Sequence, residues 1–229
     1  MASAALAGST GLVGGHILTQ LLAHPSIASV HAFTRRELPN PTASTKLLPL
    51  SSTDTSTWAS LFPRSPAPSV FLSGLGTTRA AAGSVKAQRE IDLDLNYELA
   101  KAAKDAGVET YVLISTGGAS SSSSMAYPKM KGELEEKVKA LGFKHTVLLR
   151  PGLIVGSRNE SRFAEAVART IASGLGKVSP MLVNGWAQDA DVIARAAVNA
   201  GLLCVEGKKE AGLWEVGMTE IVELGKKVN

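Results

Sequence analysis

The feature that most limits how this chain can fold lies in its first fourteen residues. An apolar run, residues 4–7, is followed by Gly8, Gly11 and Gly14 and then by an amphipathic helical pattern. A buried strand that turns through glycines into a helix offers bare backbone N–H groups to a pyrophosphate. Gly8 permits the tight turn, Gly11 lets a diphosphate approach the backbone, and Gly14 lets the helix pack closely on the strand. The pattern predicts a dinucleotide site; the alternative is an ordinary strand–helix turn.

Along the rest of the chain, short apolar runs alternate with helical patterns, which predicts a parallel sheet flanked by helices. Strands are predicted at residues 4–7, 29–34, 45–50, 69–73, 110–115, 145–150 and 181–183. Helices are predicted at residues 14–23, 56–62, 86–106, 129–140, 161–173, 190–203 and 218–226. We expect an α/β fold with a doubly wound parallel sheet, in which residues 1–229 form one nucleotide-binding domain and residues 151–229 contribute a small cap on the substrate side.

The composition is that of a globular protein. Of the 229 residues, 45% are hydrophobic, 19% are charged and 5% are aromatic, and the net charge is +4. The lysines and arginines are scattered, so we expect no nucleic-acid partner, which would need a basic stripe with stacking aromatics. No apolar stretch reaches the roughly 20 residues that span a bilayer, and we expect no secretory leader. A soluble or peripherally attached protein is predicted, whose positive charge favours an anionic ligand.

Cysteine and histidine usage predicts neither disulfides nor a metal site. Cys204 is the single cysteine, so a reducing compartment is expected, and its apolar surroundings favour burial over reactivity. His16, His24, His31 and His145 show no spacing typical of metal ligands. We therefore expect no metal.

Two arginines, Arg35 and Arg36, end the second predicted strand. An acidic residue at this place would bond the ribose 2′-hydroxyl of NAD and repel a 2′-phosphate. Guanidinium groups pair well with phosphate. We therefore predict NADPH rather than NADH as the cofactor, with Arg35 as the first contact; the alternative is a solvated basic loop.

A second loop containing glycines follows the fourth predicted strand. Loops at the carboxyl ends of parallel strands face the ligand of an open α/β sheet. Gly74 and Gly76 would let this loop pass beneath the adenosine or the pyrophosphate, and Thr77 and Thr78 would offer hydroxyls. A purely structural turn explains these glycines equally well.

The fifth predicted strand delivers the residues that carry chemistry. It ends at Ser115 and Thr116, and Tyr127 and Lys131 follow at a spacing that puts both side chains on one helix face. A tyrosine hydroxyl needs a nearby cation to exchange protons, and Lys131 can supply that charge while bonding the nicotinamide ribose. Ser115 or Thr116 can hold the substrate oxygen. The set predicts proton transfer to a carbonyl oxygen; the alternative is a chance match of the spacing.

Together these motifs give the chain a family resemblance. Gly8-x-x-Gly11-x-x-Gly14 with Tyr127-x-x-x-Lys131 resembles the atypical branch of the short-chain dehydrogenase/reductase superfamily. Further matching segments are residues 75–79, 115, 131–133, 150–152 and 157–162. The whole set is similar to the Tat-interacting oxidoreductase-like proteins and, within them, to the fungal FMP52 family of the mitochondrial outer membrane.

The resemblance implies a Rossmann fold that binds NADPH. It implies that Thr10, Gly11, Leu12 and Val13 contact the phosphates, that Arg35 and Arg36 contact the 2′-phosphate, that Leu75 and Gly76 lie on the adenine side, and that Ile154 and Arg162 lie on the nicotinamide side. For Arg162, a helix-surface charge is an equal alternative. The expected cofactor-binding residues are Gly8, Ser9, Thr10, Gly11, Leu12, Val13, Gly14, Arg35, Arg36, Leu75, Gly76, Thr77, Ile154 and Arg162. The expected catalytic residues are Tyr127, Lys131, Ser115 and Thr116.

The chain departs from this resemblance in two ways. Extended relatives place an asparagine in the helix before the fifth strand to complete a proton relay, whereas Asp92 stands here, with Asn96 one turn on. The large C-terminal sugar-nucleotide domain of the epimerases is also missing from a chain of 229 residues. A nucleotide-sugar substrate is therefore not expected.

Two functions stay open. The first is an NADPH-dependent reductase of a small carbonyl compound, with Tyr127 and Lys131 as the proton relay. The second is an NADPH-binding sensor or adaptor without turnover, which docks on a partner at the mitochondrial surface; the missing substrate domain favours it. The resemblance implies peripheral attachment to the cytosolic face of the mitochondrial outer membrane, with the cytoplasm as the alternative, and the oligomeric state stays open.

Overall fold

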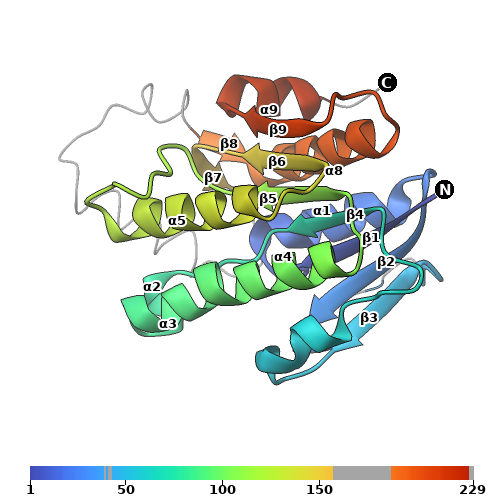
Figure 1. The fold of residues 1–229 in the computed structure, drawn as a ribbon, viewed down its shortest axis with the longest axis horizontal. Coiled ribbons are helices and arrows are strands. Elements are labelled where there is room, and N and C mark those ends of the chain that lie inside the picture. The colour runs from blue at the N-terminus through green and yellow to red at the C-terminus, as the bar shows by residue number, and fades with distance from the viewer. Residues whose placement is uncertain (39, 41–42, 157–186, 227–229) are drawn as a thin grey trace.

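The computed structural model describes residues 1–38, 40, 43–156 and 187–226. Seven strands, all parallel, form the central sheet in the order β3-β2-β1-β4-β5-β6-β9 (Figure 1). Their bounds are Ala2–Ala7 (β1), Ile27–Thr34 (β2), Leu47–Ser51 (β3), Val70–Ser73 (β4), Thr110–Ile114 (β5), His145–Leu149 (β6) and Gly212–Val216 (β9). The strand order reverses between β1 and β4, which is the place where open α/β sheets bind ligands. The predicted fold class is confirmed.

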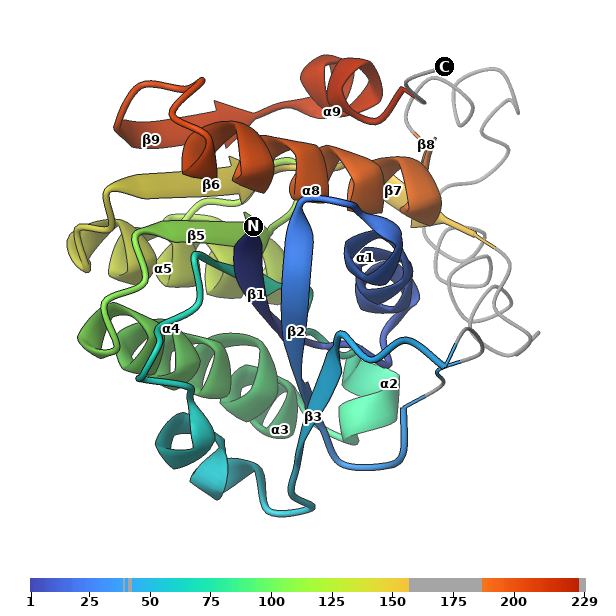
Figure 2. The same cartoon turned by 90° about the vertical axis from the view of Figure 1, so that its right-hand side faces the viewer.

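Helices cover both faces of the sheet (Figure 2). On one face lie α1 (Leu12–Ala23), α8 (Ala190–Val205) and α9 (Met218–Leu224); on the other lie α4 (Asn96–Asp105), α5 (Ala126–Ala140) and the 3-10 helix η1 (Thr55–Leu61). Each face has its own hydrophobic core. Because successive side chains of a strand point to opposite faces, Ala4 and Leu6 belong to the α1 core while Ala5 and Ala7 belong to the α4 core.

The predicted helix 86–106 has the correct extent but is not one regular α-helix. It comprises α3 (Val85–Arg89), a π-helical segment η2 (Glu90–Leu95) and α4, and it is preceded by the short helix α2 (Arg79–Ala82). At the end of η2 the Asn96 side-chain amide donates a hydrogen bond to the Asp92 carbonyl at 3.1 Å, which accompanies the departure from α-helical pairing. Gly107 then ends the helix with φ +93°, as its position predicts.

Within residues 151–229, which are expected to contribute a small cap, α8 and β9 belong to the central sheet and the helices that cover it. β9 pairs with β6 as the seventh strand, and α8 packs so closely that a Cβ on Gly201 would lie 3.2 Å from Val70. Two short strands, β7 (Leu153–Val155) and β8 (Ala187–Asp189), form a separate parallel pair. None of these three strands, β7, β8 and β9, was predicted from the sequence. The predicted strand 181–183 and helix 161–173 lie outside the described residues.

None of the helices formed by the described residues is long and apolar enough to cross a membrane. Cys204 is buried, as predicted.

Candidate dinucleotide site

The turn between β1 and α1 packs backbone directly on backbone. Gly8 has φ +83°, and a Cβ there would lie 2.5 Å from the Gly74 carbonyl of the loop after β4. A Cβ on Gly14 would lie 2.0 Å from the Gly8 carbonyl oxygen. Both residues must therefore be glycine for the turn to close, which confirms the conformational roles predicted for them.

The start of α1 is suited to an anion. Its first N–H groups lack intrahelical acceptors, its N-cap is Gly11, and among the described residues no side chain caps it. The first turn carries no acidic residue, so the positive end of the helix dipole is not offset. These features fit the phosphate groups of a dinucleotide, which the amides of Leu12, Val13 and Gly14 would bind.

Two residues of this turn differ in their roles. The Ser9 hydroxyl donates a hydrogen bond to the Phe33 carbonyl at 2.8 Å, and the residue is buried. It ties the turn to β2, so any cofactor contact from Ser9 would come from its backbone. Thr10 is half-buried at the mouth of the turn.

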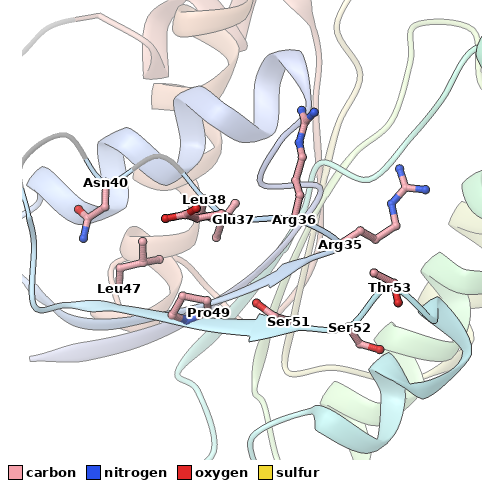
Figure 3. A pocket seen from close by; sticks show the side chains of 10 residues that line it. All are labelled: Arg35, Arg36, Glu37, Leu38, Asn40, Leu47, Pro49, Ser51, Ser52 and Thr53. Atoms are coloured by element: carbon pink, nitrogen blue, oxygen red, sulfur yellow. The ribbon is translucent and has the colours of Figure 1, made fainter.

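Arg35 and Arg36 lie at the rim of an open groove of about 550 Å³ beside the carboxyl end of β2 (Figure 3). Both are exposed, and in Figure 3 their side chains extend away from Glu37. The backbone beneath them is fixed by Thr34, which exchanges hydrogen bonds with the Arg36 backbone through its hydroxyl. The arrangement presents two guanidinium groups at the edge where a 2′-phosphate would lie.

The groove also contains polar residues that sequence analysis missed. Ser51, Ser52 and Thr53 line it at the end of β3. The signal was present in the sequence, because they follow a predicted strand whose carboxyl end shares an edge with Arg35. The other lining residues are Arg36, Glu37, Leu38, Asn40, Leu47 and Pro49.

Buried side chains of the helical segment hold the loop after β4 from below. The Thr77 N–H donates to Asp92 Oδ1 at 2.7 Å, Gln88 Nε2 donates to the Thr77 carbonyl at 3.0 Å, and Asn96 Nδ2 donates to the Leu75 carbonyl at 3.1 Å. The Thr77 amide is thus engaged inside the protein. Burial raises the pKa of Asp92, against the opposing effect of the Lys131 charge. Through its bond to the Thr77 N–H, Asp92 supports the loop after β4 directly.

Tyr127 and Lys131 lie one turn apart on α5, as predicted. Tyr127 is 39% exposed, whereas Lys131 is 3% exposed and donates from Nζ to the Ile114 carbonyl at 3.1 Å. An ammonium group has three donors, so this bond leaves others for a cofactor ribose. The helix places one accessible hydroxyl and one buried cation at the carboxyl end of β5.

The two hydroxyl residues after β5 are not equivalent. Ser115 is buried, and its Oγ donates to Glu135 Oε1 at 2.5 Å. Thr116 is half-buried, and among the described residues its hydroxyl has a single, long contact of 3.5 Å, to the Gly117 carbonyl. The structure directs the Ser115 hydroxyl hydrogen into the protein, so of the two residues expected to hold a substrate oxygen, Thr116 is the better placed.

The segment carrying Ile154 approaches the start of α1. Ile154 is half-buried and packs against the α1 core, and a Cβ on Gly156 would lie 3.5 Å from the Leu12 side chain. This contact brings the end of β7 near the turn between β1 and α1. Arg162, the other residue expected on the nicotinamide side, lies outside the described residues.

Known proteins are similar to this chain in sequence, and solved structures are similar to it in fold. The model of the NAD dependent epimerase/dehydratase family matches residues 4–193. Protein fmp52-1, mitochondrial, of Aspergillus terreus is 56% identical in an alignment of 233 positions that covers 99% of this chain and 100% of the relative. Protein fmp-52, mitochondrial, of Neurospora crassa is 45% identical in an alignment of 231 positions that covers 98% of this chain and 96% of the relative.

Among solved structures, the UDP-Glc/GlcNAc 4-epimerase of Campylobacter jejuni matches with a TM-score of 0.68 at 14% identity, covering 97% of this chain and 82% of the epimerase. MoeE5 in complex with UDP-glucuronic acid and NAD matches with a TM-score of 0.66 at 16% identity, covering 94% of this chain and 76% of that chain. At such identities the likeness shows a shared Rossmann fold.

Proposed function

The chain belongs to the NAD dependent epimerase/dehydratase family and, within it, to the FMP52 proteins, and from this premise we propose that it is an NADPH-dependent reductase of a small carbonyl compound. One observation carries the proposal: the uncapped start of α1 and the Tyr127–Lys131 pair follow β1 and β5 of one parallel sheet, and so lie on the same carboxyl edge. That edge is where an open α/β sheet binds its ligand.

Arg35 and Arg36 support NADPH rather than NADH. They are exposed at the end of β2, beside the groove that Ser52 and Thr53 also line. A carboxylate at this place would repel a 2′-phosphate, whereas two guanidinium groups attract it. The solved neighbours include proteins with NAD bound, so the preference for NADPH rests on these two residues.

The reaction needs one proton and one hydride. NADPH, when bound, would supply the hydride that the carbonyl carbon receives. The Tyr127 hydroxyl donates its proton to the carbonyl oxygen, which becomes an alcohol and leaves a phenolate on the tyrosine. The buried ammonium of Lys131 stabilises that phenolate, because opposite charges interact strongly away from bulk water. Thr116 holds the substrate oxygen.

Replacing Tyr127 by Phe tests this mechanism. The variant loses the proton donor but keeps the ring, so we expect NADPH affinity to stay unchanged and turnover to fall about 10²-fold or more. NADPH consumption is followed by absorbance with a panel of small aldehydes, ketones and quinones. Tyr97→Phe is the control, because Tyr97 lies on α4 against Lys101 and Lys137. Undiminished turnover in Tyr127→Phe would exclude the proposed mechanism.

One observation favours a second candidate, an NADPH-binding sensor or adaptor without turnover. The Ser115 hydroxyl is engaged by Glu135, so one expected substrate contact is not offered to a ligand. In this candidate Tyr127 and Lys131 hold only the ribose, and the cofactor-bound form docks on a protein partner. Cofactor-dependent capture of a partner, with no NADPH consumption across the panel, would support the adaptor and contradict the reductase.

We place the protein peripherally on the cytosolic face of the mitochondrial outer membrane. The support is that relatives more than half identical to it are named mitochondrial proteins. Fractionation tests the placement: the protein should accompany mitochondria, be digested by protease added to intact organelles, and be released by a carbonate wash. Recovery in the cytosolic fraction alone would contradict it.

A further inference from the structure

A buried carboxylate lies behind the Tyr127–Lys131 pair, and the proposed reaction does not use it. Glu135 is 2% exposed and follows Lys131 by one turn of α5. Its Oε1 accepts the Ser115 hydroxyl at 2.5 Å and the Arg150 Nε–H at 3.1 Å, and its Oε2 accepts Arg150 Nη2–H at 2.5 Å. Such a forked pair of charge-assisted bonds fixes geometry more strongly than a single contact.

Arg150 extends this network to the edge of the sheet. Its Nη1 donates to Glu215 Oε2 at 2.9 Å, its Nη2 donates to Glu215 Oε1 at 3.1 Å, and Lys139 Nζ donates to the same Oε1 at 2.8 Å. The hydrogen bonds that Arg150 donates to Glu135 raise the pKa of Arg150, and the hydrogen bond that Lys139 donates to Glu215 lowers the pKa of Glu215. The network therefore connects residues at the ends of β5 and β6 with α5 and β9.

The network anchors two loops that meet at the site. Ser115 opens the loop after β5, and Arg150 opens the segment that leads into β7. The loops also touch through their backbones, because the Gly117 N–H donates to the Pro151 carbonyl at 2.7 Å. Thr116 lies inside the first loop, and Ile154 lies in β7 after the second. Glu135 thus holds the starting points of both segments.

We propose that Glu135 is a positioning residue that sets the nicotinamide-side half of the cofactor site by holding Ser115 and Arg150 together; this inference rests on the proposed function. Because Ser115 gives its hydrogen to Glu135, the Ser115 oxygen is left as an acceptor. Removing the Ser115–Glu135 or the Glu135–Arg150 hydrogen bond would let the two loops shift. The turn between β1 and α1 would stay in place, because Gly8 and Gly14 pack it backbone on backbone. The Arg35–Arg36 segment would stay in place too, because Thr34 bonds to the Arg36 backbone.

Binding of two different ligands can be used to test the two halves of the site separately. NADPH would occupy both halves, whereas adenosine 2′,5′-bisphosphate carries the adenosine with its 2′- and 5′-phosphates and lacks the nicotinamide half. We expect Glu135→Gln and Ser115→Ala to bind NADPH about tenfold more weakly than the wild type and to bind adenosine 2′,5′-bisphosphate equally well. Lys139→Gln is the matched control, because it breaks an ion pair at the partly exposed outer end of the network, and it should bind both ligands like the wild type.

Calorimetric titration of each folded variant decides between the outcomes. If the variants bind both ligands more weakly to the same extent, or bind both as tightly as the wild type, the positioning role of Glu135 is overturned. A wild type that binds neither ligand would overturn the proposed function itself, and the inference with it. Glu135→Gln removes the buried negative charge that pairs with Arg150, and it is the variant at risk of misfolding. In that case Ser115→Ala, which leaves the Glu135–Arg150 pair intact, gives the decision alone.

Discussion

Gly14 is the residue at which the site tolerates an added atom least. Its Cβ would lie 2.0 Å from the Gly8 carbonyl oxygen, a backbone atom that cannot move without opening the turn. We expect Gly14→Ala to lower the free energy of unfolding by about 1–3 kcal/mol and to abolish tight NADPH binding. Urea denaturation and a fluorescence titration with NADPH measure the two effects.

The neighbouring glycine provides the control for this prediction. A Cβ on Gly15 would lie 3.7 Å from the Ser9 carbonyl oxygen, which is an ordinary contact. Because alanine favours a helix over glycine by about 1 kcal/mol, Gly15→Ala should leave the free energy of unfolding unchanged or raise it. Equal losses in both variants would show that the close approach at Gly14 is not the cause.

At the scale of single residues, the roles of some residues could be predicted from the sequence and those of others could not. The roles of Gly8 and Gly14 follow from local spacing, since a strand–turn–helix imposes them within seven residues. The partners of Ser9 and Ser115 could not be predicted in this way. Their hydroxyls bond to Phe33 and Glu135, which are 24 and 20 residues away and adjacent only in the folded chain.

At the scale of elements, η2 and the loop after β4 form one buried unit through Asp92. Burial raises the pKa of Asp92 above its ordinary value of 3.8, so the fold prefers the protonated form. This preference stabilises the folded state fully at pH values below the ordinary pKa of 3.8. The stabilisation is lost as the pH rises through the raised pKa of the folded state.

Asp92→Asn tests this coupling, because asparagine keeps an oxygen acceptor for the Thr77 N–H and does not titrate. We expect the free energy of unfolding of the variant to rise relative to the wild type as the pH is raised from below 3.8 to neutrality. Urea denaturation of both proteins across this range measures the difference. A difference that is constant, or that changes in the opposite direction, would contradict a raised pKa for Asp92.

Strands with buried apolar runs were predicted well, whereas the edge strand β9 was not predicted. Strands β1, β4, β5 and β6 are buried almost throughout, so their apolar runs stand out. β9 is an edge strand with an exposed Leu213 and a charged Glu215, which Arg150 and Lys139 pair across space. Its apolar pattern is therefore interrupted, and nothing local in the sequence predicts the pairing.

At the scale of the whole molecule, the site is a consequence of parallel topology. Each strand–helix unit brings its carboxyl end to the same edge, so the glycine turn after β1, the arginines after β2 and the tyrosine–lysine pair after β5 share that edge without being close in sequence. This is why the fold class could be predicted, and why the residues expected to form the site lie at one edge of the sheet. The position of β9 in the main sheet could not be predicted in this way, because β9 pairs with β6, which lies much earlier in the sequence.

Calorimetric titration with NADPH and NADH tests the central claim, that the amides at the start of α1 and the guanidinium groups of Arg35 and Arg36 bind a dinucleotide phosphorylated at the 2′ position. We expect the wild type to bind NADPH at least about tenfold more tightly than NADH. The double variant Arg35→Ala/Arg36→Ala should lose that preference, while Arg64→Ala, in an exposed loop, should keep it. Equal affinity of the wild type for both dinucleotides, or no heat with either, would contradict the claim.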